Sequence, residues 1–201
     1  MSHFPEAQFL TSANAVSQFV ADAGAEVAVA GRSNAGKSSA INVIVNRRQF
    51  ARTSKTPGRT QLVNFFSLRE GQRLVDLPGY GFAQVSDKKR RHWGGLLADY
   101  FQVRESLKGL ILVADIRRQL TDYDRRMMEF AEHVNLPIHI LLTKSDKLKR
   151  GQAAKAELEV KKELDGRASV QQFSALKRHG EDEARAVLER FLSEGPTAAN
   201  R

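Results

Sequence analysis

Cysteine is absent from this sequence. Disulfide bonds, zinc–thiolate sites and thiol catalysis are therefore excluded, and the composition suits a reducing compartment. Long apolar runs are also missing, because no stretch approaches the roughly 20 residues of a membrane-spanning helix. The first thirty residues carry Glu6, Asp22 and Glu26 without an uninterrupted apolar core, which is not the pattern of a secretory signal. We expect a cytoplasmic protein that does not associate with membranes.

Acidic residues are outnumbered by basic ones, 23 against 32, so the formal net charge is +9. A strong positive charge favours polyanionic partners, nucleic acid first among them, although it can also serve solubility alone. The 201 residues are enough for one domain with a substantial core. We expect an N-terminal docking segment at 1–24, a single globular domain at 25–195 and a tail at 196–201.

Strand-like and helix-like segments alternate along the globular part of the chain. The expected strands are 26–30, 62–67, 73–76, 110–114, 138–142 and 169–173. The expected helices are 40–45, 86–104, 123–134, 150–165 and 181–192. A turn at 69–72 joins two strands into an antiparallel hairpin, whereas the helical crossovers between the others require parallel strands. This order predicts an α/β fold in three layers: a mostly parallel six-stranded sheet with one antiparallel edge strand, and helices on both faces.

Residues 31–38 (GRSNAGKS) read G-x-x-x-x-G-K-S, the pattern of a phosphate-binding loop. The pattern stands between an apolar strand and an apolar helical run, where such a loop belongs, so an ordinary glycine turn is the weaker interpretation. Gly31 and Gly36 allow backbone N–H groups to point inward around oxyanions, and the following helix directs its positive end to the same place. Lys37 adds a charge for the outer phosphates, and the Ser38 hydroxyl can coordinate Mg²⁺.

Two further segments carry groups that can respond to a terminal phosphate. Residues 76–79 (DLPG) follow the second hairpin strand; Asp76 can hold Mg²⁺ through water, and the N–H of Gly79 can contact a γ-phosphate. A turn aspartate is the commoner explanation when this pattern stands alone, but its place after the phosphate loop favours the nucleotide interpretation. Thr56 and Thr60 lie in an irregular polar segment, and Thr60, beside the next strand, is the better candidate for a second hydroxyl on Mg²⁺.

Residues 143–146 (TKSD) follow the buried strand 138–142 and predict which base is bound. Guanine presents an N1–H and an N2 amine side by side, and the ionised carboxylate of Asp146 can accept from both. Adenine lacks this pair of donors and would leave the carboxylate unsatisfied. The stem of Lys144 can lie along the base plane. After the last strand, the N–H of Ala175 can reach the guanine O6, although the segment 173–175 would mean nothing by itself.

Four ordered segments now point to a known family. GRSNAGKSS, KTPGRTQ, LVDLPGYG and LLTKSDK resemble the signatures of the YihA/EngB (YsxC) family of bacterial ribosome-biogenesis GTPases, within the translation-factor-like class, and the resemblance covers nearly the whole chain. It implies a Ras-like P-loop GTPase fold, hydrolysis of GTP to GDP and phosphate, and a requirement for Mg²⁺. It also implies a role in assembly of the large ribosomal subunit and a link to normal cell division and septation.

Carried over by position, the resemblance implies a full set of site residues. Those that contact the nucleotide are Gly31, Arg32, Ser33, Asn34, Ala35, Gly36, Lys37, Ser38, Ser39, Gly58, Arg59, Thr60, Gln61, Leu62, Asp76, Leu77, Pro78, Gly79, Thr143, Lys144, Ser145, Asp146, Phe173, Ser174 and Ala175. Lys37, Thr60 and Gly79 are the implied catalytic residues. Ser38 and Thr60 are the implied ligands of Mg²⁺, with Asp76 acting through water.

Three positions qualify the expected activity. Thr143 stands where Asn is commoner in GTPases, and its hydroxyl can replace part of the bonding of that amide. Tyr80 follows Gly79 where Ras-type enzymes have the glutamine that positions water, and a phenol cannot orient the water in the same way. We therefore predict slow intrinsic hydrolysis that depends on a partner or an ion. Asn34 resembles the phosphate-loop Asn of relatives that recruit K⁺, which makes K⁺ a second candidate cofactor.

Basic residues gather beside the segments that should respond to the nucleotide. Residues 47–59 include five basic residues and no acidic one, and residues 88–91 (KKRR) follow the 76–79 loop. Besides GTP and GDP, we expect this face to contact ribosomal RNA of the large subunit or its precursor, under control of the bound nucleotide. Solvated basic loops are the alternative. The protein is expected to be monomeric.

Two other functions fit parts of the pattern. A small P-loop kinase or ATPase shares the phosphate loop, but Asp146 and the lack of an evident acceptor-binding insert argue against it. An RNA-binding module whose nucleotide site is only structural is the other alternative. It predicts that Lys37→Ala abolishes folding rather than function.

Overall fold

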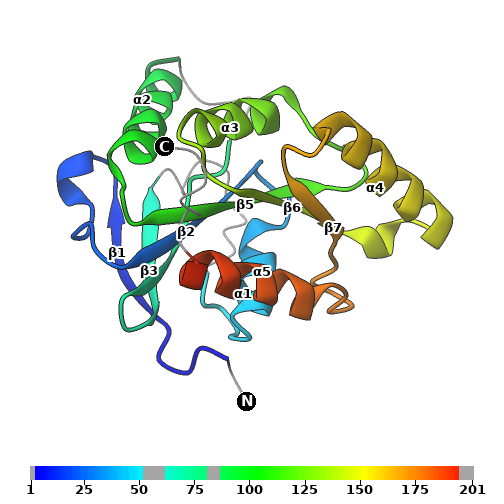
Figure 1. Ribbon diagram of the computed structural model, residues 1–201, viewed down its shortest axis with the longest axis horizontal. Helices are drawn as coiled ribbons and strands as arrows, with labels where there is room; N and C mark the ends of the chain where they lie inside the picture. Colours follow the sequence, from blue (N-terminus) through cyan, green and yellow to red (C-terminus); the bar gives the residue numbers. More distant parts are fainter. Residues whose placement is uncertain (1–2, 52–61, 81–86, 195–201) are drawn as a thin grey trace.

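One sheet forms the middle layer of the computed structural model, which describes residues 3–51, 62–80 and 87–194, with the backbone alone at 87–91, 93 and 194 (Figure 1). The sheet has seven strands in the order β1-β3-β4-β2-β5-β6-β7. The strands are β1 Gln8–Ala13, β2 Ala25–Gly31, β3 Val63–Arg69, β4 Gln72–Asp76, β5 Leu107–Asp115, β6 Ile138–Thr143 and β7 Ser169–Gln172. The helices are α1 Lys37–Ile44, α2 Asp87–Val103, α3 Asp122–His133, α4 Arg150–Leu164 and α5 Glu181–Glu194, with short 3-10 turns η1 Val16–Gln18 and η2 Ser145–Lys147.

The predicted class, a mostly parallel sheet between two helical layers, is confirmed. All six expected strands are present, and β3 runs antiparallel to its neighbour β4 at the predicted side of the sheet. The expected count of six strands was wrong, because β1 adds a seventh by pairing antiparallel with β3. The register of β1 shifts between Phe9 and Thr11, and such a bulge breaks the two-residue alternation by which a strand is recognised in a sequence.

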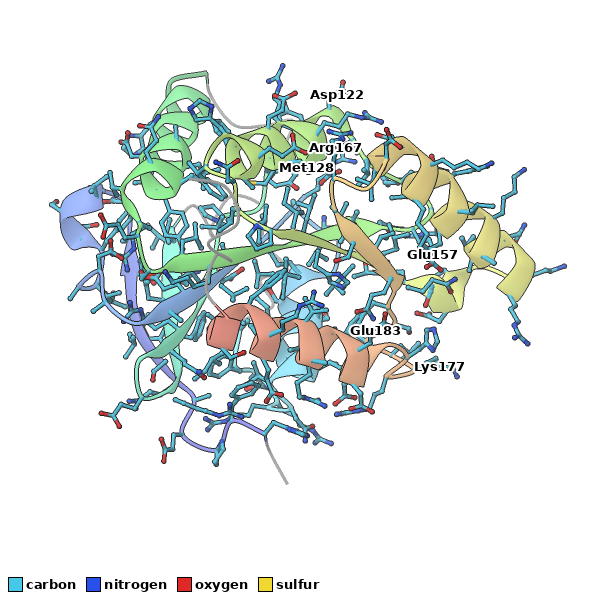
Figure 2. The ribbon with its side chains drawn as sticks, viewed as in Figure 1. Asp122, Met128, Glu157, Arg167, Lys177 and Glu183 are labelled. Atoms are coloured by element: carbon cyan, nitrogen blue, oxygen red, sulfur yellow. The ribbon has the colours of Figure 1, made fainter. Side chains whose placement is uncertain are left out.

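The two faces of the sheet are covered by different helices. Figure 1 shows α1 and α5 below the sheet and α2 and α3 above it, with α4 beside β7. Side chains of β2 alternate between the two layers, since Val27 and Val29 belong to the core under α1 and α5, whereas Ala28 and Ala30 belong to the core under α2, α3 and α4. In Figure 2, Met128 on α3 and Glu183 on α5 mark these opposite sides. No helix in the described part of the chain is long and apolar enough to cross a membrane.

The central parallel strands end at the same edge of the sheet. Gly31 at the end of β2 pairs with Val113, and Asp115 at the end of β5 pairs with Thr143 at the end of β6. A Cβ atom at Gly31 would lie 2.6 Å from the carbonyl oxygen of Val113, so only glycine permits this close approach. Segments that follow parallel strands therefore meet here, which is where α/β proteins bind ligands.

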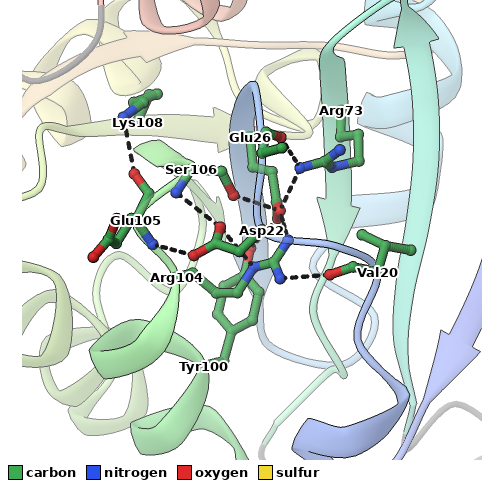
Figure 3. A network of polar contacts seen from close by, with 10 residues as sticks. Val20, Asp22, Glu26, Arg73, Tyr100, Arg104, Glu105, Ser106 and Lys108 are labelled. Carbon is green, nitrogen blue, oxygen red and sulfur yellow. Dashed lines mark hydrogen bonds and ion pairs between the residues drawn. The ribbon is translucent and has the colours of Figure 1, made fainter.

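A buried polar network holds the opposite end of β2 (Figure 3). Glu26 is fully buried, and its carboxylate accepts hydrogen bonds from Arg104, from the Ser106 hydroxyl at 2.7 Å and from the Tyr100 hydroxyl at 3.2 Å. Arg104 also donates to the carbonyl of Val20 at 2.7 Å. Tyr100 in the last turn of α2 and Arg104 just after the helix thus tie this end of α2 to β2, and Arg104 also ties it to the segment before β2.

Candidate functional site

The phosphate loop has the backbone of an anion site. Gly36 adopts a left-handed conformation with φ 98° and precedes the first turn of α1, and Asn34 is left-handed with φ 63°. Among the described side chains none caps this helix, and its first turn holds no acidic residue. The N–H groups of that turn and the positive end of the helix therefore face the loop, an arrangement that suits a phosphate.

Lys37 and Asp76 meet beside this helix terminus. The Lys37 ammonium group forms an ion pair with Oδ1 of Asp76, and both side chains are nearly buried. Asp76 ends β4, and Ser38 stands in the first turn of α1. Hydroxyl and carboxylate oxygens are ligands that Mg²⁺ prefers, so this donor set fits the ion. The described residues include no group of three or more His, Asp or Glu side chains placed to hold a metal ion.

The segment after β4 lies directly against the phosphate loop. The N–H of Leu77 donates to the carbonyl of Val29 at 2.9 Å, and the N–H of Ser33 donates to the carbonyl of Tyr80 at 2.8 Å. Gly79 is close enough to the loop that a Cβ atom there would lie 3.5 Å from the backbone of Ser33. The two segments predicted to surround the outer phosphates are therefore neighbours.

Tyr80 turns its side chain into the protein. The residue is 3% exposed, and its hydroxyl donates to Oδ1 of Asp124 on α3 at 2.5 Å. Burial and the neighbouring carboxylate raise the pKa of Tyr80 well above its usual value, so the phenol stays protonated. The phenol is therefore engaged by α3.

The carboxylate predicted to read guanine is held in place. Asp146 in η2 accepts a hydrogen bond of 2.6 Å from the Ser174 hydroxyl, and Lys147 lies 3.6 Å away. The hydrogen bond from Ser174, with a smaller contribution from Lys147, lowers the pKa of Asp146 against the opposing effect of burial. The group is therefore ionised at neutral pH and can accept two hydrogen bonds from a ligand.

Residues 143 and 144 join the base segment to the phosphate loop. The buried hydroxyl of Thr143 lies 3.0 Å from the carbonyl oxygen of Ala114 and is also within bonding distance of the carbonyl oxygen of Ala35. Lys144 has a left-handed backbone with φ 60°, and its ammonium group donates to the carbonyl of Asn34 at 2.6 Å. A hydroxyl at position 143 thus supplies a link to the phosphate loop, as expected for the replacement of Asn.

Asp115 is a site residue that the sequence analysis missed. Its Oδ2 lies 3.0 Å from the Lys144 ammonium group, and the Arg117 guanidinium contacts both carboxylate oxygens at 2.9 and 2.7 Å. Burial opposes ionisation, but the bonds from Arg117 and Lys144 prevail and hold the pKa of Asp115 well below its usual range. Its position at the end of a buried parallel strand, where ligand sites form, is the sequence feature that could have identified Asp115 as a candidate site residue.

A cavity of about 590 Å³ lies between the phosphate loop and Asp146. Predicted residues from the phosphate loop, from 143–146 and from 173–175 line the cavity: Gly36, Ser39, Thr143, Lys144, Asp146 and Ala175. The sequence analysis did not include Leu176, which also lines the cavity and is 71% exposed. A large apolar side chain this exposed beside the cavity is suited to cover a flat base.

Several predicted site residues are either outside the described residues or do not present a side chain to the site. Thr56, Gly58, Arg59, Thr60 and Gln61 lie outside the described residues, as do the side chains at 88–91. The Phe173 side chain is fully buried in the core, so the residue can offer a ligand only its backbone. Of the basic residues at 47–59, Arg48 is exposed, whereas Arg47 donates a hydrogen bond to the carbonyl of Ala7.

Known proteins share this arrangement of segments. Residues 26–144 match the protein family described as 50S ribosome-binding GTPase. The chain is 51% identical over 192 residues to the probable GTP-binding protein EngB of Hydrogenovibrio crunogenus, with 94% of this chain and 91% of that protein covered. It is 46% identical over 196 residues to the protein of the same name from Escherichia coli O139:H28, with 96% and 93% covered.

Solved structures share the fold. A probable GTP-binding protein engB is similar with a TM-score of 0.68 and 19% identity, over 85% of this chain and 100% of that one. Era, solved in complex with MgGDPNP and nucleotides 1506–1542 of 16S ribosomal RNA, is similar with a TM-score of 0.63 and 19% identity, over 84% of this chain and 57% of that one.

Proposed function

Because the chain belongs to the EngB family of P-loop GTPases, we propose that it acts as a GTP-controlled switch in assembly of the large ribosomal subunit. Membership of a GTPase family sets aside the kinase and ATPase alternative. The observation that carries the proposal is the direct backbone contact between Ser33 of the phosphate loop and Tyr80, which follows the γ-phosphate-sensing segment 76–79. A ligand seated on the phosphate loop can act on that segment through this contact.

The site residues would have different roles in GTP hydrolysis. Lys37 and the N–H groups at the start of α1 would bind the phosphates and offset their charge. Mg²⁺ held by Ser38, Thr60 and, through water, Asp76 would supply further positive charge on the phosphate oxygens. The N–H of Gly79 would hold the γ-phosphate. Since the Tyr80 phenol is bonded to Asp124, water is not oriented by that residue and the intrinsic rate should be low.

Potassium is the proposed source of added positive charge. Asn34 is exposed on the phosphate loop, and its backbone carbonyl is already fixed by Lys144. The side chain is therefore the part of Asn34 that is free to turn toward a cation beside the phosphates. A bound K⁺ would then contribute the charge that Ras-type enzymes obtain from a partner.

The partner that fits the charge distribution is ribosomal RNA in the large subunit or its precursor. The chain has a formal charge of +9, and basic residues at 47–59 and 88–91 flank the segments expected to respond to the γ-phosphate. Contacts of this kind should depend steeply on salt, because each neutralised RNA phosphate releases counterions. The protein would act as a monomer in the cytoplasm. Its link to cell division and septation would follow from the supply of ribosomes.

Cosedimentation with purified large subunits tests the proposal. The wild-type protein is incubated with subunits and either GDP or guanylyl imidodiphosphate, at several salt concentrations. We expect the bound fraction to differ several-fold between the nucleotides and to fall steeply with salt. Small subunits serve as the control for general RNA affinity. Equal binding with both nucleotides, or to both subunits, would contradict a nucleotide-controlled role on the large subunit.

A further inference from the structure

Tyr80 connects the segment after β4 to two other parts of the protein. Its backbone carbonyl accepts the hydrogen bond from the N–H of Ser33, and the residue forms a parallel bridge with Arg32 of the phosphate loop. Its hydroxyl donates to Oδ1 of Asp124 at 2.5 Å, and its ring stacks on that of Tyr123 with the ring centres 6.1 Å apart. One residue is thus bonded both to the phosphate loop and to α3.

Asp124 is fixed independently of this contact. Its Oδ2 accepts hydrogen bonds from the N–H of Thr121 at 2.8 Å and from the Thr121 hydroxyl at 2.7 Å, which completes the capping box of α3. The side chain is 2% exposed in the first turn of the helix. A phenol that donates to a fixed, buried carboxylate makes a strong and directional bond. A purely apolar side chain at position 80 would pack there without such an anchor.

The anchor acts on the residue next to it. Gly79 lies between Asp76 and Tyr80 and passes close to the backbone of Ser33. Because both the carbonyl and the hydroxyl of Tyr80 are bonded, the direction of the neighbouring peptide groups is restricted. We propose that Tyr80 is a positioning residue whose bond to Asp124 holds Gly79 in place for the γ-phosphate and so raises the affinity for GTP relative to that for GDP. This inference rests on the proposed contact between Gly79 and the γ-phosphate.

The nucleotide dependence distinguishes positioning from simple packing. A bond that orients Gly79 changes the affinity for a triphosphate, whereas GDP has no γ-phosphate and is indifferent to it. A packing role would weaken binding of both nucleotides, or only the stability of the fold. The ratio of the two affinities is therefore the informative quantity.

A double-mutant cycle tests the inference. Affinities for GDP and guanylyl imidodiphosphate are measured by competition with fluorescent GDP for Tyr80→Phe, Asp124→Ala and the double variant. We expect each single change to lower the triphosphate affinity roughly tenfold with GDP affinity nearly unchanged, and the double variant to lose no more than a single one. Tyr123→Phe, which removes a phenol from the next residue on α3, is the matched control and should change neither affinity.

The outcomes separate this inference from the proposed function. Equal losses for both nucleotides, or losses that add in the double variant, overturn the positioning role of Tyr80. Gly79→Pro removes the N–H of residue 79. If this variant has a lower triphosphate affinity and Tyr80→Phe does not, the γ-phosphate contact stands and the inference alone fails. If Gly79→Pro changes neither affinity, the proposed contact itself is wrong. Thermal unfolding is followed for each variant, and Asp124→Asn replaces Asp124→Ala in the cycle if the latter does not fold.

Discussion

The Ser174 hydroxyl donates a 2.6 Å hydrogen bond to Oδ1 of Asp146, so the loop after β7 orients a carboxylate on the loop after β6. The N–H of Lys177 in turn donates to the Ser174 oxygen at 3.1 Å, which fixes the hydroxyl. A carboxylate that is ionised and oriented before the ligand arrives loses little freedom on binding. Such preorganisation favours selectivity for the one base that offers two donors side by side.

Asp146→Asn should change the base preference. The amide keeps one acceptor but turns a donor toward the N2 amine of guanine, whereas xanthine carries a carbonyl group at that position. We expect GDP affinity to fall roughly 10²-fold or more, and xanthosine diphosphate to bind better than GDP. Competition with fluorescent nucleotides measures both. Asp99→Asn, an exposed position on α2, should leave the preference unchanged, and an unaltered preference in Asp146→Asn would refute the assigned role.

Lys37→Ala distinguishes a working nucleotide site from a structural one. The change leaves Asp76 nearly buried without its ion pair, at a cost of about 2 kcal/mol, which lowers the Tm by roughly 4–8 °C in a chain of this size. We expect a folded protein with wild-type circular dichroism whose GDP affinity is reduced about 10²-fold. Adding Asp76→Asn should recover part of the Tm without recovering binding. Loss of folding in both variants would instead favour the RNA-binding module with a structural site.

The elements and the local motifs were predictable because each depends on residues close together in the sequence. The phosphate loop, for example, is set by Gly31, Gly36 and Lys37 between a strand and a helix. Contacts between motifs were not predictable, since they depend on the order of strands in the sheet. Asp115 meets Lys144 only because β5 and β6 are neighbours.

Two further features were also not predicted. The strand Gln8–Ala13 was missed because its bulge disrupts the alternation that the other strands show. The side-chain direction of Tyr80 was open as well, because the partner Asp124 lies 44 residues further along the chain. The sequence shows only that Tyr80 occupies the position where Ras-type enzymes have a glutamine. The fold shows that its hydroxyl is bonded to Asp124.

Asn34→Gly should separate potassium stimulation from nucleotide binding. Asn34 has φ 63°, a conformation that glycine adopts without strain, so the phosphate loop should keep its shape in the variant. We expect the wild-type protein to hydrolyse GTP several-fold faster in K⁺ than in Na⁺ at equal ionic strength. The variant should show equal rates in both salts while its GDP affinity stays within about twofold. Equal rates for the wild-type protein would remove the role proposed for K⁺.

His139 makes the stability of the sheet depend on pH, away from the nucleotide site. The ring is 2% exposed on β6, with Nδ1 at 2.7 Å from the Ser169 hydroxyl and Nε2 at 2.9 Å from Oε1 of Gln171. Burial lowers the pKa of His139 to about 4, with the bond to Gln171 opposing the shift and the charge of Arg190 adding to it. The imidazole is therefore neutral in the folded protein at any pH near 7.

His139→Gln should remove one part of the acid sensitivity. The imidazole has a pKa of about 6.5 in the unfolded chain and about 4 in the folded protein. Between these two pH values, the unfolded state binds a proton at His139 and the folded state does not. The free energy of unfolding should therefore fall by about 2 kcal/mol from pH 7 to pH 5 through this group alone. Urea titrations of the variant should show a decline smaller by that amount, whatever its stability at pH 7. His133→Gln, at an exposed position on α3, should decline like the wild type; an unchanged decline in His139→Gln would show that the buried imidazole does not contribute.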